Sequence, residues 1–275
     1  MTIWDSIILG IVEGLTEFLP VSSTGHLTIA SKMLGLKIDD PAITAFTAVI
    51  QFGAIAAVVL FMWKDISRYA VAWFRGLRKP EYRGEFDHRM GWYIIVGSLP
   101  IGIVGFLAKD IISGPLRSLW WVAGSLIAWS FVMIAAERLG SKSRPQEKLT
   151  LTDAIVMGLV QCLALIPGVS RSGATIAAGL FRGLDRVAST RLAFLLGIPA
   201  LVGAAVFELK DALNGTVGAV PLLIGTVVSF IVGYASVAWL IRFVAKHSTE
   251  VFAFYRILLG IVILILLATS TITAT

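Results

Sequence analysis

Long apolar stretches separated by short basic loops dominate the chain. A helix needs about 20 apolar residues to cross the hydrocarbon core of a bilayer. Six stretches without Asp, Glu, Lys or Arg approach or exceed this length, at 41–63, 90–108, 118–136, 192–207, 212–241 and 257–275. The pattern therefore predicts an all-helical polytopic membrane protein with six full transmembrane helices.

Two further apolar regions, 6–36 and 153–181, are each interrupted midway by a polar break that contains proline. Neither half of either region is long enough to cross a bilayer. Non-helical backbone at membrane depth is tolerated where it is buried in protein or lines a cavity. We therefore expect each region to form a re-entrant helix-loop-helix hairpin around a polar site.

The two interrupted regions resemble each other. When residues 10–26 are written above 158–174 without gaps, Val12, Leu15 and Ser22 fall on identical residues, and glycines coincide near both ends. Each copy precedes three longer spans, and an odd number of crossings inverts the second copy. The sequence therefore predicts a single membrane domain built from two inverted repeats. The first is 1–150, with its hairpin at 1–36, and the second is 151–275, with its hairpin at 152–182. Such paired broken helices usually meet near the midplane and form the site.

Charge and composition support a membrane topology. Mean hydropathy is +0.87 and the formal net charge is +6. Sixteen basic residues lie in the loops at 64–89, 138–150, 182–191 and 242–247, which alternation places on one side. The positive-inside rule puts these loops inside and the termini outside, so the net charge reflects topology and gives no reason to expect nucleic acid. The single cysteine, Cys162, excludes an internal disulfide.

The first break combines acids, hydroxyls and a histidine. Glu13 and Glu17 are four residues apart, so both carboxylates project from one helix face before Pro20 ends that helix. We expect a second short helix to start near Gly25, where free amides attract an anion. The residues that cap this helix or lie in its first turn are Ser22, Ser23, Thr24 and His26.

The second break places Arg171 at the position of Ser23, flanked by Ser170, Ser172 and Thr175. An unpaired Glu or Arg at bilayer depth costs about 2.5 to 3.5 kcal/mol, so these charges need compensation. A structural salt bridge between Glu17 and Arg171 would be one solution. A polar cavity that binds a phosphate and a divalent cation is the other, and the added hydroxyls and histidine favour it.

Candidate roles follow from residue chemistry. Glu13 and Glu17 suit a hard cation such as Mg²⁺ or Ca²⁺, whose shell substrate oxygens would complete. Arg171 offers a planar fork for a phosphate. His26 can carry a proton or attack as nucleophile, and Ser23 is an alternative nucleophile if His26 removes its proton. The sequence does not choose among Ser23, His26 and water. For Arg256 there are two readings: a part in the site, or an interfacial arginine that snorkels toward the inner headgroups, which is the favoured expectation.

The motifs EGLTEFLPVSSTGH and PGVSRSGAT resemble the bacitracin-resistance family of undecaprenyl-diphosphate phosphatases, and the resemblance covers nearly the whole chain. It implies a phosphoric anhydride hydrolase that converts undecaprenyl diphosphate to the monophosphate and recycles the lipid carrier for peptidoglycan synthesis. It also implies a divalent metal, bacitracin resistance, and an inner-membrane site that opens outward, with the lipid substrate and bilayer lipids as partners. The family's important positions match Glu13, Glu17, Ser22, Ser23, Thr24, His26, Ser170, Arg171, Ser172 and Thr175.

Two rival functions remain open at this point. Inverted repeats with broken helices are common in transporters, so a polyprenyl-phosphate flippase or transporter is the main alternative, alone or combined with the hydrolase. A purely structural membrane scaffold would leave the clustered acids unexplained. A homodimer is compatible with the sequence, which does not fix the oligomeric state.

Overall fold

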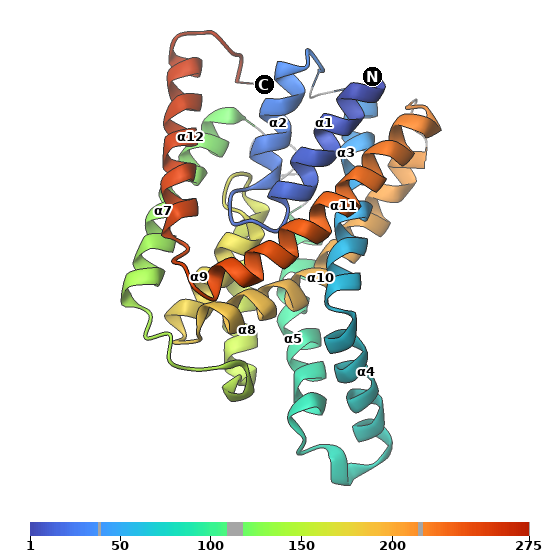
Figure 1. Cartoon of the computed structure of the whole chain (residues 1–275), viewed down its shortest axis with the longest axis vertical. Helices are drawn as coiled ribbons and strands as arrows, with labels where there is room; N and C mark the ends of the chain where they lie inside the picture. The colour runs from blue at the N-terminus through green and yellow to red at the C-terminus, as the bar shows by residue number, and fades with distance from the viewer. Residues whose placement is uncertain (38–39, 109–117, 214–216, 275) are drawn as a thin grey trace.

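The computed structural model describes residues 1–37, 40–108, 118–213 and 217–274. All regular elements in these ranges are helical. The α-helices are α1 (Ile3–Thr16), α2 (Ser23–Met33), α3 (Pro41–Phe61), α4 (Trp63–Arg78), α5 (Phe86–Leu107), α7 (Leu119–Leu139), α8 (Leu151–Gln161), α9 (Arg171–Phe181), α10 (Arg186–Leu213), α11 (Ala219–Val244) and α12 (Glu250–Ala268). Short 3₁₀ helices are η1 (Pro80–Tyr82), η3 (Gln146–Lys148) and η4 (Cys162–Leu165). Figure 1 shows their arrangement.

Six of these helices are long and apolar enough to cross a membrane, which confirms the predicted number and makes the chain a multi-pass membrane protein. Their ends differ from the prediction, because charged residues begin two of them. The helix α10 starts at Arg186, and α12 starts at Glu250 and continues through Arg256. Residues 214–216 of the predicted span at 212–241 lie outside the described ranges.

The two interrupted regions form two short helical hairpins, α1–α2 and α8–α9. Both hairpins begin with a capping box, Thr2 with Asp5 in α1 and Thr150 with Asp153 in α8. In such a box the side chain of each residue bonds the backbone of the other. The returning helices α2 and α9 each contain 11 residues, and the N-cap residue of each has positive φ, 77° at Ser22 and 73° at Ser170. The sequence similarity therefore extends to the backbone.

Each hairpin packs against a long helix from the other half of the chain. The helix α1 lies on α11, and α8 lies on α5. An added Cβ at Gly10 would clash with the carbonyl oxygen of Gly225, and one at Gly158 would clash with that of Gly97. Glycine permits such close helix contact because backbones approach where side chains are smallest. The two halves are therefore interlocked.

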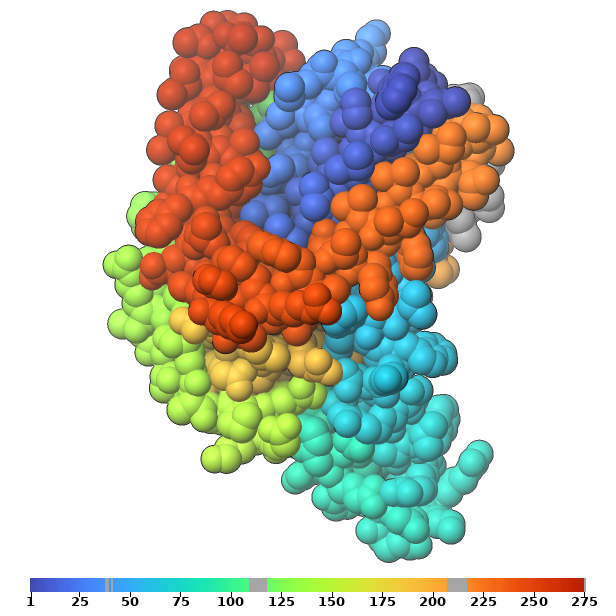
Figure 2. All heavy atoms as spheres, viewed as in Figure 1, coloured from blue at the N-terminus to red at the C-terminus, as the bar shows by residue number. Residues whose placement is uncertain are grey.

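The hairpins approach the centre of the molecule from different ends. In Figure 1, α1 and α2 lie in the half that carries both termini, whereas α8 rises from the opposite end. The helices α4 and α5 protrude from the body at that opposite end, as the space-filling view in Figure 2 also shows. The two breaks consequently come together in the interior.

Candidate active site

The first contact between the two breaks is an ion pair. Glu17 follows the last residue of α1, and Arg171 is the first residue of α9. The Arg171 Nη2 donates to Glu17 Oε1 at 2.7 Å, and the two side chains are only 16% and 5% exposed. Arg171 Nη1 also donates to the carbonyl oxygen of Gly197 at 2.9 Å. The structure therefore joins the acid of one break to the base of the other.

Glu17 also holds the hydroxyl of Ser23. The Ser23 Oγ donates to Glu17 Oε2 at 2.6 Å. A carboxylate within hydrogen-bond distance of a hydroxyl is placed to accept its proton during nucleophilic attack. One carboxylate thus contacts the hydroxyl of a candidate nucleophile through one oxygen and the guanidinium of Arg171 through the other.

His26 lies in the first turn of α2, as predicted, but faces other partners. Its Nδ1 is 2.7 Å from the carbonyl oxygen of Ser22, and its Nε2 is 2.7 Å from the hydroxyl of Tyr255. A carbonyl only accepts hydrogen bonds, so Nδ1 carries the proton and Nε2 of the neutral ring accepts from Tyr255. In this arrangement Ser23 is paired with Glu17 and not with His26.

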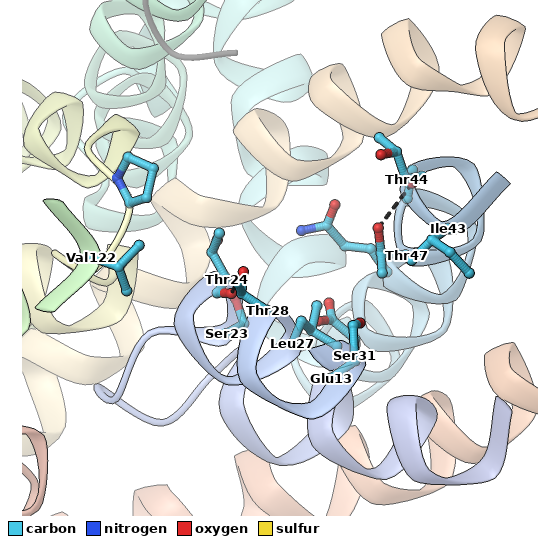
Figure 3. A pocket seen from close by; sticks show the side chains of 13 residues that line it. Glu13, Ser23, Thr24, Leu27, Thr28, Ser31, Ile43, Thr44, Thr47 and Val122 are labelled. Carbon is cyan, nitrogen blue, oxygen red and sulfur yellow. Dashed lines mark hydrogen bonds between the residues drawn. The ribbon is translucent and has the colours of Figure 1, made fainter. Parts of the chain in front are cut away.

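A cavity of about 230 Å³ opens beside these residues, between α2 and α3. Figure 3 shows Ser23 and Thr24 on one side, Thr44 and Thr47 on the other, and Glu13 between them. The Glu13 side chain is buried, and its Oε1 has no hydrogen-bond partner among the described residues. An unpaired buried carboxylate oxygen is costly unless a ligand, a cation or water satisfies it.

The donor set fits a hard divalent cation whose shell is mostly water and phosphate. No group of three or more His, Cys, Asp or Glu side chains occurs among the described residues, so a cage made only of such side chains is absent from them. Mg²⁺ keeps several waters and is commonly bound by one or two carboxylates plus substrate phosphates. Glu13 supplies a free oxygen, and Glu17, one turn away, would supply a second carboxylate by exchanging its hydrogen bond with Arg171 or Ser23 for the cation. These are the residues that would hold the cation.

The hydroxyls of the second break bond within the protein. Ser172 Oγ donates to the carbonyl oxygen of Leu19 at 3.1 Å, so it joins the two breaks. Ser170 Oγ accepts from the backbone N–H of Gly173 and caps α9. Thr175 Oγ1 donates to the carbonyl oxygen of Arg171. Within the described chain these three residues do not line the cavity, whereas Thr24 and Ser23 do.

Ser22 is the N-cap residue of α2. It is buried with φ of 77°, and its side chain makes no capping hydrogen bond in the described part of the chain. The helix α2 begins at Ser23, two residues before the predicted start near Gly25. Ser23 and Thr24 therefore belong to the first turn, where the backbone N–H groups are free to face an anion.

The expectation that Arg256 snorkels to the membrane surface is wrong. Its side chain is fully buried, and Nη1 donates to the carbonyl oxygen of Pro20 at 3.2 Å. Its Nη2 donates to the carbonyl oxygen of Gly168 at 2.9 Å, and Nε donates to Ser130 Oγ at 3.1 Å. Arg256 thus ties the first break to the second. A charge within an apolar run was the available signal, because such residues usually face the interior of the bundle.

Sequence reasoning also missed an ion-pair cluster at the start of α8. Arg144 Nη2 lies 2.6 Å from Asp153 Oδ2, and Arg182 Nε lies 2.9 Å from Oδ1. Burial alone would raise the pKa of Asp153, but hydrogen bonds from Arg144, Thr150 and Arg182 lower that pKa to about 2. This cluster fastens the second hairpin to the neighbouring loop. It lies at the far end of α8 from the break and plays a structural part.

Comparison with known proteins identifies the family. The family model described as bacitracin resistance protein BacA matches residues 6–262. Undecaprenyl-diphosphatase 3 of Frankia casuarinae is 54% identical over 278 residues and covers 100% of both chains. The undecaprenyl-diphosphatases of Acidothermus cellulolyticus and Corynebacterium diphtheriae are 50% and 53% identical over 98% of this chain and 98% and 96% of their own. The chain belongs to the BacA family of bacitracin resistance proteins.

Proposed function

We propose that this chain is an integral membrane phosphatase that hydrolyses undecaprenyl diphosphate to undecaprenyl phosphate and inorganic phosphate. The full-length relatives that carry the name undecaprenyl-diphosphatase support this reaction. One structural observation carries the proposal at the level of chemistry. A single carboxylate, Glu17, accepts hydrogen bonds from the hydroxyl of Ser23, which is the nucleophile we propose, and from the guanidinium of Arg171, and Ser23 lines the cavity.

The reaction returns the lipid carrier to the monophosphate form used in peptidoglycan synthesis. Bacitracin captures the diphosphate form of the carrier, so an abundant phosphatase would confer resistance, in agreement with the family's description. The names of the relatives describe a hydrolase and give no support to the flippase alternative.

The residue geometry suggests how attack on the terminal phosphorus proceeds. Ser23 Oγ would form the new P–O bond as its proton passes to Glu17 Oε2, and the bond to the undecaprenyl phosphate oxygen would break. Glu17 would pass this proton to the departing undecaprenyl phosphate and regain its charge. A water that gives a proton to Glu17 Oε2 would then attack the phosphoserine, the bond between phosphorus and Ser23 Oγ would break, and the proton would return to Ser23 as phosphate is released. Direct attack by a water held at Glu17 reaches the same products. Either route fits the observed contact better than attack by His26, whose ring nitrogens face Ser22 and Tyr255.

Arg171 and the helix N-termini would stabilise the transferring phosphoryl group. A planar guanidinium binds phosphate oxygens in pairs and offsets the charge that develops on them. Ser22 and Thr24 lie at the start of α2, where free backbone N–H groups attract an anion. A divalent cation held by Glu13 and Glu17 would add Lewis-acid polarisation of a phosphoryl oxygen when bound.

We place the site near the outer face of the bacterial inner membrane, within two inverted halves at 1–150 and 151–275. The basic loops support an inside position for the protruding α4–α5 end. The matched caps and positive-φ N-caps of the two hairpins support the inverted repeat, with both hairpins re-entrant. A lipid substrate would then reach the cavity from within the bilayer.

Phosphate release from purified protein tests the function. The protein in detergent is incubated with undecaprenyl diphosphate and Mg²⁺ or Ca²⁺, and free phosphate is measured with and without EDTA. We expect metal-dependent release that Arg171→Ala nearly abolishes while the protein stays monodisperse on gel filtration. Absence of release from the wild-type protein at any metal concentration would overturn the proposal.

A further inference from the structure

His26 has a partner outside both breaks. Tyr255 lies on α12, 229 residues away along the chain, and its hydroxyl is 2.7 Å from His26 Nε2. The two rings are nearly parallel, with an interplanar angle of 17° and ring centroids 5.6 Å apart. The contact therefore joins the last helix to the first turn of α2.

The contact fixes which nitrogen of His26 is available. The Ser22 carbonyl oxygen at 2.7 Å requires a proton on Nδ1. In the neutral ring Nε2 then carries only a lone pair, which accepts from the hydroxyl of Tyr255. Neither nitrogen is free to remove the proton of Ser23, whose hydroxyl donates to Glu17.

The neighbouring Arg256 holds Tyr255 in place. Arg256 is fully buried and donates to the carbonyl oxygens of Pro20 and Gly168, one in each break. Tyr255 directly precedes it on the same helical turn and is 44% exposed. The arginine thus sets the position of α12, and the tyrosine projects from that fixed turn to the histidine.

We propose that Tyr255 is a positioning residue for His26. The Ser22 carbonyl oxygen fixes the proton on Nδ1, and the Tyr255 hydroxyl then donates to Nε2, holds the ring in place and reserves Nε2 as an acceptor at the site. The consequence for catalysis rests on the proposed hydrolysis, in which Nε2 exchanges Tyr255 for a water or a protonated phosphate oxygen. The orientation of His26 itself does not rest on that reaction, so the two ideas can fail separately.

Chemical modification of His26 tests the orientation without any substrate. Diethyl pyrocarbonate acylates an unprotonated imidazole nitrogen, and peptide mass spectrometry reports the rate at each histidine. Tyr255→Phe removes the donor to Nε2, and we expect His26 to react about fivefold faster, the factor that corresponds to about 1 kcal/mol for one hydrogen bond. His88 and His247 serve as internal references. An unchanged rate at His26 would overturn the proposal.

The catalytic consequence is tested by a double-mutant cycle on phosphate release. Tyr255→Phe should lower kcat about tenfold, the scale of about 1.4 kcal/mol, with KM nearly unchanged. In a His26→Gln background the same substitution should have no further effect, because a positioning residue acts through its partner. Tyr234→Phe on α11 is the matched control. Multiplicative losses in the two variants would show that Tyr255 acts independently of His26 and would contradict the proposal.

Discussion

The two breaks share a backbone design and differ in their charges. Both follow a short capped helix, both turn through a serine with positive φ, and both start an 11-residue helix. The first carries Glu13, Glu17 and His26, whereas the second carries Arg171. The comparison shows how two similar hairpins can make an asymmetric contact. The two loops share a backbone conformation and lie together, and their different side chains put acid and base on opposite sides of one contact.

The largest effect is expected at the point where the two breaks meet. Glu17→Gln keeps the shape of the side chain but removes the base and the charge that Ser23 and Arg171 contact. Because general-base catalysis contributes about 10²- to 10⁴-fold, we expect kcat for phosphate release to fall about 10³-fold. Thermal unfolding of the purified variant is measured in parallel.

The matched control for this substitution is Asp5→Asn. It neutralises a half-buried carboxylate at the start of the same helix, and it should leave phosphate release within a factor of two. If Glu17→Gln kept full activity, the proposal that the Glu17 carboxylate acts as the base would be contradicted.

The acidic residues of the two capping boxes should differ in how much they stabilise the folded protein. Asp153 is fully buried and pairs with two arginines, whereas Asp5 is half-buried and, among the described residues, bonds within its capping box. Removing one partner of a buried ion pair costs about 3 to 5 kcal/mol, so Asp153→Asn should lower the free energy of unfolding by about that amount. Loss of a helix cap costs about 1 kcal/mol, which is the expectation for Asp5→Asn. Chemical unfolding in mixed micelles measures both, and equal losses would contradict the assigned difference.

Protonation of Asp153 at low pH should destabilise the second hairpin. The pKa of Asp153 is lowered from 3.8 to about 2 in the folded protein. The carboxylate therefore contributes its full stabilisation above pH 3.8, and this contribution is lost as the pH falls toward 2. We expect the stability difference between wild type and Asp153→Asn to shrink over this interval. A difference that stayed constant down to pH 2 would show that the ion pairs do not stabilise the fold.

A smaller effect is expected at Glu13, whose equivalent in the second break is Gln161. Glu13→Gln imposes the second break's residue on the first and removes the charge of a residue that lines the cavity and whose Oε1 has no partner among the described residues. Since the cation would lose one of its two carboxylates, we expect the Mg²⁺ concentration for half-maximal phosphate release to rise about tenfold, about 1.4 kcal/mol. Titration of activity with Mg²⁺ measures it. If the Mg²⁺ concentration for half-maximal release did not change, Glu13 would not be a ligand of the cation.

Much of the architecture was predictable from the sequence because membranes impose strong patterns. The lengths of the apolar stretches predicted the number of spans, and the polar breaks at Pro20 and Pro167 predicted where the hairpins lie. The ends of α10 and α12 were not predictable by charge counting. Charged residues lie inside these helices where partners exist, as Arg256 shows.

The sequence predicted several residues that lie in contact, but not most of the long-range contacts around them. Spacing and the repeat selected Glu17, Ser23 and Arg171, which the structure brings together. The tyrosine partner of His26 and the arginines of Asp153 come from segments far apart along the chain. Such pairs depend on how distant helices dock, and no local pattern in one sequence encodes them.

A double-mutant cycle between Glu17 and Arg171 tests the central claim most directly, because it asks whether residues from the two breaks act as one site. Glu17→Gln, Arg171→Gln and the double variant are purified, and phosphate release from undecaprenyl diphosphate is measured under single-turnover conditions. The account predicts that the double variant is no slower than the slower single variant, because each change already breaks the shared contact. Losses that multiply, so that the double variant falls far below both single variants, would contradict it.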